Sequence, residues 1–514
     1  MIYIALVVVL LVALYLYNVR NFDYWEKRGV VYEKPIIFFG SVIRNYLLLE
    51  SMTTTINKFY KKYPNEKLIG AFRSTTPILV LKDPAMVKQV IISDFVYFHE
   101  RGIVPGKSLE PLFKNLFFGE GDLWRLLRQR LTPAFTSGKL RAMFPLIVER
   151  AENLRARALK AAVNGRTMDA RDLMARYTTD FIGACGFGLD ADSLNDEDAA
   201  FRQLGIKIFT FDFHDAIVVL LKDMFPIMAR NLKIMGKVEK ELILLVREIL
   251  RKRNNKPSGR HDFIDLLLEC QNQGTVVGQS IEKFNEDGSP KQARLEFDEL
   301  IIAAQVFVFF AAGFETSSSA TSFTLHQLAY HPEVQEKVHK EIDTVLAKYD
   351  NKLSYDAIKE MTYLEWTFKE AMRIFPSLGF LARTCRRKYT FPGTDLSIDE
   401  GVNIFIPIEA FHNDPQYWSK PQEFRPERFH PDEFNEIQRS IYLPFGDGPR
   451  NCIGGRLGLM QSLAGLAAIL SQFRVEPAPE TKRYPTVDPT SHVVQSISGG
   501  LPLLFNQRVG VRAC

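Results

Sequence analysis

The sequence feature that most constrains the fold is a glycine-rich segment around one cysteine near the end of the chain. Residues 445–454 read Phe-Gly-Asp-Gly-Pro-Arg-Asn-Cys-Ile-Gly, and a long helical pattern, 454–473, follows. Glycine and proline at these positions predict a tight loop. Cys452 is therefore expected just before a helix N-terminus, where exposed N–H groups and the positive end of the helix dipole stabilise a thiolate. Hydrogen bonds from such a loop also tune the potential of an iron bound to the sulfur.

Composition excludes several other classes of site and partner. The five cysteines are odd in number and contain no Cys-x-x-Cys pair, which argues against a disulfide framework and against a zinc site. Such usage is typical of a domain in the reducing cytosol. The net charge is +5 without a long Lys/Arg block, so nucleic acid is not an expected partner. A hydrophobic share of 46% allows a large buried core.

The N-terminus predicts a membrane anchor. Residues 1–17 are apolar and uncharged, at the lower limit of the roughly 17–25 residues that span a bilayer. No basic residue precedes this run and no small-residue cleavage site follows it, which favours an uncleaved anchor over a secretory signal peptide. Because Arg20, Lys27 and Arg28 come after the run, the rest of the chain is expected in the cytoplasm. A second apolar stretch, 216–228, is expected either in the core or at the bilayer surface.

The rest of the sequence predicts a mainly α-helical fold with small β-sheets. Two β-prone runs, 67–73 and 77–82, predict a hairpin, and Asp83 followed by proline predicts a helix start after it. A polar, glycine-containing stretch, 271–293, predicts a surface loop. The apolar run 301–314 is too short to span a membrane and predicts a buried core helix.

Polar residues follow at the end of that apolar run. Residues 312–317 read Ala-Gly-Phe-Glu-Thr-Ser. Gly313 opens the wall of a helix to a flat cofactor or to dioxygen. An acid followed by a hydroxyl, as at Glu315 and Thr316, relays protons. A kinked helix in which Thr316 bonds to its own turn explains the same residues equally well, so both interpretations stay open here.

Two further pairs of residues share a helix face. Glu370 and Arg373 are three residues apart, and Trp124 and Arg128 are four apart. Taken alone, Glu370 and Arg373 are interpreted as a surface ion pair that contributes little to the stability of the fold. The second, taken alone, is a half-buried tryptophan beside a solvated arginine.

Taken together, these segments resemble the cytochrome P450 superfamily. Residues 445–454 match its pattern Phe-x-x-Gly-x-Arg-x-Cys-x-Gly without a gap. The segments 312–317, 370–373 and 424–429 (Phe-Arg-Pro-Glu-Arg-Phe) precede it in the expected order. Residues 303–323 resemble the insect microsomal branch, which is associated with oxidising plant toxins and insecticides.

The resemblance covers nearly the whole chain after the anchor. It implies the cytochrome P450 fold, preceded by one transmembrane helix. The predicted division is an anchor at 1–17, a connector at 18–34 and a haem-thiolate monooxygenase domain at 35–514.

The resemblance also implies a role for each motif. Cys452 is the proximal ligand of a haem iron, and Arg450 contacts a haem propionate. Glu315 and Thr316 lie over the distal face of the haem and help to deliver protons. Other haem-binding residues that the resemblance implies are Trp124, Arg128, Arg383, Phe445 and Gly446. The residues implied for a buried structural core are Glu370, Arg373 and Arg428.

The implied activity is that of a haem-thiolate monooxygenase (EC 1.14) in the endoplasmic reticulum membrane. It inserts one oxygen atom of O₂ into apolar small molecules, such as plant toxins or insecticides. No Gly-x-Gly-x-x-Gly dinucleotide fingerprint follows a strand, so electrons from NADPH are expected through a partner flavoprotein reductase. Cytochrome b5 is a second expected electron donor.

Two other functions stay open. One is a haem-thiolate isomerase or dehydratase that needs no reductase, and Thr316 argues against it. The other is a non-catalytic membrane protein that binds apolar ligands, and the intact Cys452, Thr316 and Glu370 argue against it. Candidate substrate-pocket residues, taken from family analogy and apolar character, are Phe113, Phe117, Phe211, Phe213, Phe307, Phe380 and Ile497.

Overall fold

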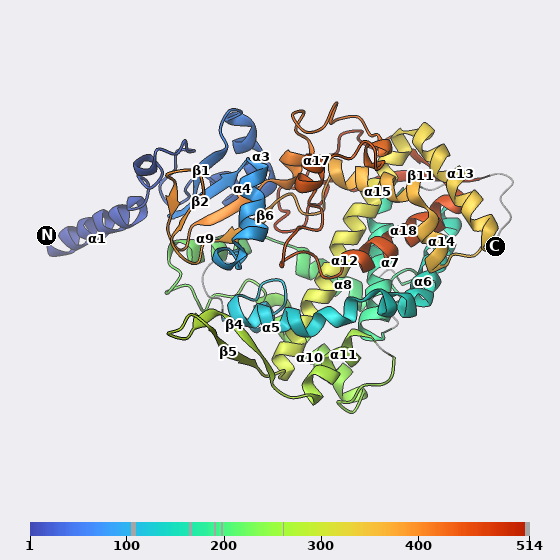
Figure 1. Cartoon of the computed structure of the whole chain (residues 1–514), viewed down its shortest axis with the longest axis horizontal. Coiled ribbons are helices and arrows are strands. Elements are labelled where there is room, and N and C mark those ends of the chain that lie inside the picture. Colours follow the sequence, from blue (N-terminus) through green and yellow to red (C-terminus); the bar gives the residue numbers. More distant parts are fainter. Residues whose placement is uncertain (104–108, 164–166, 190–191, 197–198, 261, 509–514) are drawn as a thin grey trace.

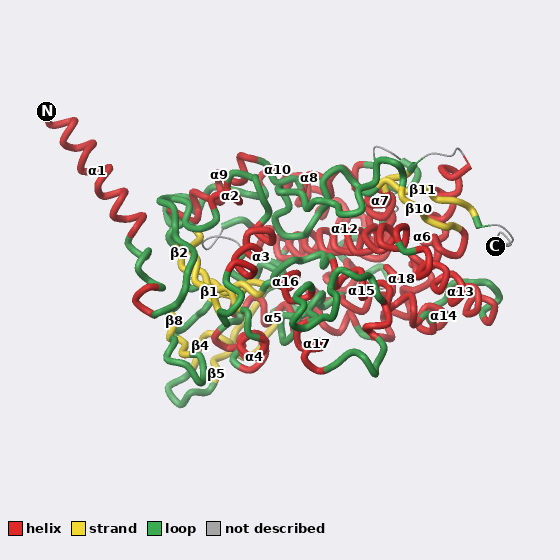
Figure 2. Tube along the Cα trace, turned by 90° about the horizontal axis from the view of Figure 1, so that it is seen from above, coloured by secondary structure: helices red, strands yellow, loops and turns green. Residues whose placement is uncertain are grey.

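The computed structural model describes residues 1–103, 109–163, 167–189, 192–196, 199–260 and 262–508. Helices dominate this part of the chain and small sheets complete it, which confirms the predicted fold class (Figures 1 and 2). The helices are α1 (Ile2–Val19), α2 (Ile43–Tyr46), α3 (Met52–Lys62), α4 (Pro84–Lys88), α5 (Gly121–Leu131), α6 (Ser137–Val163), α7 (Ala170–Phe181), α8 (Ala200–Phe209), α9 (Phe213–Met224), α10 (Gly236–Lys252), α11 (Phe263–Asn272), α12 (Glu299–Tyr330), α13 (Pro332–Lys348), α14 (Tyr355–Glu360), α15 (Thr362–Ile374), α16 (Ile408–His412), α17 (Glu436–Ile441) and α18 (Gly455–Gln472). The strands are β1 (Leu68–Arg73), β2 (Thr76–Leu81), β3 (Met168–Asp169), β4 (Val276–Phe284), β5 (Pro290–Leu295), β6 (Leu381–Thr384), β7 (Tyr389–Thr390), β8 (Ser397–Ile398), β9 (Asn403–Ile406), β10 (Phe473–Pro477) and β11 (Pro502–Gln507).

Helix α12 runs through the middle of the molecule, and most of its side chains are buried (Figure 1). It packs most extensively against α7 and also contacts α10, α15 and α18. The predicted core helix is confirmed, but it continues well past residue 314. Hydroxyl groups in its second half are satisfied by bonds within the helix. Thr321 Oγ1 donates to the Ser317 carbonyl at 2.7 Å, and Thr324 Oγ1 donates to the Ala320 carbonyl at 2.7 Å.

The predicted hairpin opens the largest sheet among the described residues. Strands β1 and β2 pair antiparallel, with Leu68 opposite Leu81 and Arg73 opposite Thr76. The sheet order is β1-β2-β9-β6, and β2 runs parallel to β9. The predicted helix start is also present. The Asp83 carboxylate accepts the backbone N–H groups of Ala85 and Met86, as an N-cap does.

The surface loop predicted at 271–293 is wrong. Strands β4 and β5 form an antiparallel hairpin there, and the hairpin packs against α5 (Figure 1). The Asp122 carboxylate of α5 accepts the Ser280 hydroxyl at 2.8 Å and the Ile281 N–H at 2.8 Å. Most of the hairpin's side chains face solvent, so the strands lack the alternating apolar pattern that predicts them.

Helix α1 projects from one corner of the molecule (Figure 2). Two described helices, α1 and α12, are long and apolar enough to cross a membrane. In the most apolar 18-residue stretch of each helix, 6% is buried in α1 and 72% in α12. The Tyr17 hydroxyl, near the end of α1, donates to the Met224 carbonyl at 2.9 Å. In the connector, Trp25 is fully buried and its Nε1 donates to the Ala71 carbonyl at 2.9 Å. The segment that follows α1 therefore packs against the first sheet.

The stretch predicted at 216–228 divides into two parts. Ala216, Val218 and Val219 of α9 are buried, as the core alternative predicts. Ile227 and Met228, after the helix, are 79% and 83% exposed. Contact of these two residues with a bilayer stays a prediction.

Candidate active site

The segment around Cys452 forms a tight loop that leads into α18. Gly446 and Gly448 have φ angles of 66° and 69°, in the left-handed region that favours glycine. A Cβ at Gly448 would also collide with the carbonyl oxygen of Ile91. The Cys452 N–H donates to the Phe445 carbonyl at 2.8 Å, which closes the loop. Cys452 therefore lies three residues before the first residue of α18, close to where the sequence predicts it.

The Cys452 side chain lines a cavity of about 230 Å³. It is exposed there, whereas Cys185, Cys270 and Cys385 are buried. Surrounding protein raises the pKa of the Cys452 thiol, while a hydrogen bond from the Gly454 backbone and the charges of Arg128 and Arg101 lower it. These effects on the pKa oppose each other. A bound metal cation would therefore hold the Cys452 sulfur as a thiolate.

Helix α12 and the cysteine loop form facing walls of this cavity. Ala312, Gly313 and Thr316 line it from α12, and Phe445 and Cys452 line it from the loop. Added to Gly313, a Cβ would lie 3.0 Å from the side chain of Ile182, so the glycine also allows close packing against the segment after α7. The arrangement leaves room for a flat group between α12 and the sulfur.

Three arginines gather near one side of the cavity without an ion-pair partner among the described residues: Arg383 and Arg450 are buried, and Arg101 is half-buried. Burial lowers the pKa of Arg101 to about 10, and burial with repulsion from Arg101 lowers the pKa of Arg383 to about 9. Burial also lowers the pKa of Arg450 strongly, and repulsion from the other two arginines adds to this effect. The Nε atoms of Arg101 and Arg383 are buried and have no hydrogen-bond partner. Buried, unpaired guanidinium groups fit a ligand that brings its own carboxylates, as haem does with its two propionates.

The three arginines are held by backbone carbonyl groups. Arg450 Nε donates to the His99 carbonyl at 2.7 Å, and its Nη2 donates to the Gly119 carbonyl at 2.8 Å. Arg101 Nη2 donates to the Arg450 carbonyl at 2.9 Å. Sequence reasoning missed Arg101, because no neighbouring motif marks it and its burial beside Arg450 arises from tertiary packing.

Trp124 and Arg128 of α5 contact the loop that carries Cys452. The Arg450 guanidinium lies 4.4 Å from the centroid of the Trp124 ring. Arg128 donates to the Asn451 carbonyl at 2.9 Å and to its Oδ1 at 2.6 Å. The structure thus brings both residues to Arg450 and Asn451, and binding of haem by Trp124 and Arg128 stays a prediction.

Glu315 and Thr316, the predicted proton relay, each have a protein partner of their own. The Glu315 carboxylate forms an ion pair with Arg171 of α7. The Thr316 hydroxyl donates to the Ala312 carbonyl at 2.6 Å, which is the helix-internal bond that the sequence left open. The hydroxyl oxygen still has lone pairs with which to accept a hydrogen bond, so a role in proton delivery stays a prediction.

Glu370, Arg373 and Arg428 meet in the interior, away from the surface. Arg373 Nε donates to Glu370 Oε2 at 2.7 Å, and Arg428 Nε donates to Glu370 Oε1 at 3.2 Å. The three side chains are at most 4% exposed. Arg373 also donates to the carbonyl groups of His412 and Pro421, so the cluster ties α15 to the segment before the cysteine loop.

A second, mainly apolar pocket adjoins the first cavity. Both are lined by Phe117, Ala312, Thr316 and Leu378. Of the predicted pocket residues, Phe113, Phe117, Phe211 and Phe307 line it.

The other three predicted pocket residues lie outside this lining. Phe213 is 57% exposed at the first position of α9. Phe380 packs edge-on against Phe405, with ring centroids 5.3 Å apart, and Ile497 is buried in the hydrophobic core. Apolar character alone does not distinguish a pocket wall from a core or a helix start, and substrate contact by these three residues stays a prediction.

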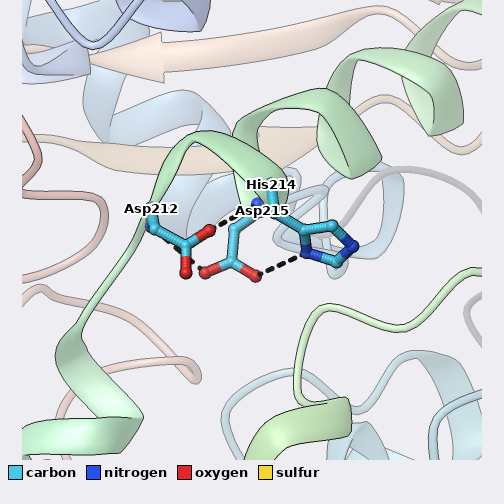
Figure 3. Close-up of side chains that lie close together, drawn as sticks. All are labelled: Asp212, His214 and Asp215. Atoms are coloured by element: carbon cyan, nitrogen blue, oxygen red, sulfur yellow. Dashed lines mark hydrogen bonds and ion pairs between the residues drawn. The ribbon is translucent and has the colours of Figure 1, made fainter.

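One acidic group resembles a metal site but is a helix cap. Asp212, His214 and Asp215 lie close together at the start of α9 (Figure 3). Asp212 accepts the Asp215 N–H and Asp215 accepts the Asp212 N–H, which is the reciprocal pattern of a capping box. The Lys237 ammonium group lies 2.6 Å from the Asp215 carboxylate and offsets its charge. These contacts account for the group without an ion.

Residues 32–502 match the family model for cytochrome P450. The chain is 38% identical over 494 residues to a Helicoverpa armigera protein named cytochrome P450 6B6, and the match covers 94% of each chain. It is 37% identical over 508 residues to cytochrome P450 6B2 of the same species, covering 97% of each chain. It is 36% identical over 491 residues to the Drosophila melanogaster protein named probable cytochrome P450 6a20, covering 94% of this chain and 95% of the relative.

Proposed function

The chain belongs to the cytochrome P450 family and is a haem-thiolate monooxygenase, and from this we propose its substrates, its electron source and its location. We propose that it oxidises apolar small molecules, including xenobiotics such as plant toxins or insecticides. Its electrons come from NADPH through a flavoprotein reductase, with cytochrome b5 as a further donor. It acts in the endoplasmic reticulum membrane, held by α1, with the catalytic domain in the cytoplasm.

The observation that carries this proposal is the junction of the two cavities. The cavity of Cys452 and the apolar pocket share Ala312 and Thr316 as lining residues. A molecule in the apolar pocket therefore lies beside the space that fits haem. The curated relatives named above are insect proteins, which supports the detoxification branch of the family.

Each part of the site has a proposed task. Bound haem supplies the activation of dioxygen. The Cys452 thiolate would hold the haem iron and donate electron density to it. Arg101, Arg383 and Arg450 hold the two propionates and fix the orientation of the ring.

On the opposite wall, Thr316 and Glu315 manage protons. The Ala312 carbonyl fixes the direction of the Thr316 O–H bond, so that the oxygen's lone pairs accept from a donor in the cavity. Arg171 holds the Glu315 carboxylate at the pocket wall, next to Thr316. Protons pass between these groups and the cavity.

The test is product analysis with the full-length haem-loaded protein, a microsomal NADPH–flavoprotein reductase and a chemically varied panel of apolar substrates. We expect hydroxylated products and NADPH consumption that depend on the reductase. Products formed without NADPH would instead support the isomerase or dehydratase. Binding of the panel without any product would support the non-catalytic function.

A further inference from the structure

The wall of the apolar pocket contains several polar side chains, and most of them are already hydrogen-bonded to other protein groups. Arg171 is paired with Glu315, and Thr316 with the Ala312 carbonyl. The remaining bonded hydroxyl groups are those of Thr490, which donates to Asp488 at 2.7 Å, and of Ser491 and Ser496, which lie 2.9 Å apart. The orientation of each of these groups is therefore fixed at least in part by a protein partner, although their oxygen lone pairs and the other N–H groups of Arg171 are still able to bond.

His492 differs from all of them. Its ring lines the pocket and stacks on the ring of Phe211, with centroids 4.3 Å apart and an interplanar angle of 7°. Neither ring nitrogen forms a hydrogen bond or an ion pair with any residue in the described part of the chain. His492 is therefore held in place by its ring face, while its two polar atoms remain available.

The imidazole is neutral at physiological pH. Burial lowers the pKa of His492 to about 4, and the positive charge of Arg73 acts in the same direction. Arg73 is itself paired with Asp223 at 2.8 Å. A neutral imidazole presents one N–H donor and one acceptor, and it binds a neutral polar group without the cost of burying a charge.

We propose that His492 is the residue that selects and orients the substrate, through a hydrogen bond to one oxygen of an otherwise apolar molecule. This inference rests on the proposed function and names its substrate class: apolar molecules that carry a carbonyl or ether oxygen. Aromatic walls bind apolar surface but do not fix its direction, whereas one directed hydrogen bond in such a pocket does. A ligand without the oxygen leaves the imidazole unpaired, which costs affinity.

The same placement predicts where such a substrate is oxidised. His492 lies in the segment between α18 and β11, whereas Ala312 and Thr316 line the pocket from α12. A molecule whose oxygen is held at His492 directs its remaining apolar part towards α12. Oxidation is therefore expected on the part of the molecule away from its own oxygen.

The test uses 2-acetylnaphthalene and 2-ethylnaphthalene, which differ mainly in one carbonyl group. Their binding to the full-length haem-loaded protein is measured by equilibrium dialysis. We expect the wild type to prefer the ketone by about fivefold, the effect of one net hydrogen bond. His492→Phe keeps the stacking on Phe211 and should abolish the preference while leaving binding of the hydrocarbon unchanged. His492→Asn, which keeps a donor and an acceptor, should restore part of the preference.

The matched control is Thr490→Val, because the Thr490 hydroxyl is already bonded to Asp488; its preference for the ketone should equal that of the wild type. A ketone preference that persists in His492→Phe would overturn the inference, as would the absence of binding by both compounds. Turnover with the reductase is measured in parallel. Preferential binding without any turnover would reject the proposed function but leave the role of His492 intact. Turnover without a preference for the ketone would support the proposed function and reject the role of His492.

Discussion

At the scale of single residues, exposure separates Cys452 from the other described cysteines. Cys185, Cys270 and Cys385 are buried, and burial raises the pKa of each thiol. Such thiols are inert because the thiolate is the form that binds metals. Cys452 is the one exposed thiol among these four, and the charges of Arg128 and Arg101 oppose the rise of its pKa that the surrounding protein causes.

We therefore expect Cys452→Ser to abolish the thiolate-type absorption shift of the ferrous carbon-monoxide complex. A serine hydroxyl does not replace the thiolate as an iron ligand. Single alanine substitutions at Cys185, Cys270 and Cys385 are the controls, and each should keep the shift. Retention of the shift in Cys452→Ser would show that the sulfur is not the ligand.

Thr316→Val removes one hydroxyl while keeping the shape of the side chain. If the hydroxyl guides protons, NADPH should still be consumed. The ratio of product to NADPH should fall several-fold, by about tenfold at most, and the amount of peroxide should rise. The matched control is Thr324→Val, whose hydroxyl makes the same bond one turn back along α12, at 2.7 Å to Ala320. Equal ratios in both variants would mean that Thr316 only bonds to its own helix.

At the scale of secondary-structure elements, local patterns were predictable and partnerships across the fold were not. The β1–β2 hairpin and the start of α4 follow from short stretches of sequence, because their determining contacts are local. The β4–β5 hairpin was missed because Asp122, which bonds to it, lies 158 residues before Ser280. Arg171 was missed for the same reason, since it lies 144 residues before Glu315.

Asp122→Ala should detach the β4–β5 hairpin from α5. The substitution leaves the Ser280 hydroxyl and the Ile281 N–H without their charged acceptor, a loss of about 1.5–3 kcal/mol for each such bond. Hydrogen exchange measured by mass spectrometry should become at least about tenfold faster in residues 276–284 and remain unchanged in α12. Glu286→Ala, an exposed position in the turn of the hairpin, should change neither region. Unchanged exchange in Asp122→Ala would show that packing alone holds the hairpin.

At the scale of the whole molecule, α1 is set apart from the body that carries the site. Its side chains are largely exposed, and the described contacts near its end are those of Tyr17 with Met224 and Phe225. The apolar helix was predictable because a long uncharged run is visible without any tertiary information, and its role as a separate anchor stays a prediction. The pocket was predicted less well, since only four of its seven proposed residues line it.

Deletion of residues 1–17 should release most of the protein from membranes but leave haem binding intact. Neither cavity is lined by any of these residues, so the carbon-monoxide spectrum should not change. Partial retention is expected to come from the exposed Ile227 and Met228, and Ile227→Ser with Met228→Ser in the deleted chain should remove it. A truncated chain that sediments with membranes as completely as the full one would contradict the dominance of α1.

The composition of α12 has a consequence for the synthesis of the chain. Because its hydroxyl groups bond to its own backbone, α12 is as self-sufficient as a membrane span, and its hydropathy matches one. The ribosome reaches α12 before α15 and α18, which later cover it. In the membrane-anchored arrangement that we propose, the α12 segment is close to the bilayer with its apolar surface still uncovered. Rapid docking on α7 and α10, which are already made, therefore decides whether the segment becomes a core or a second span.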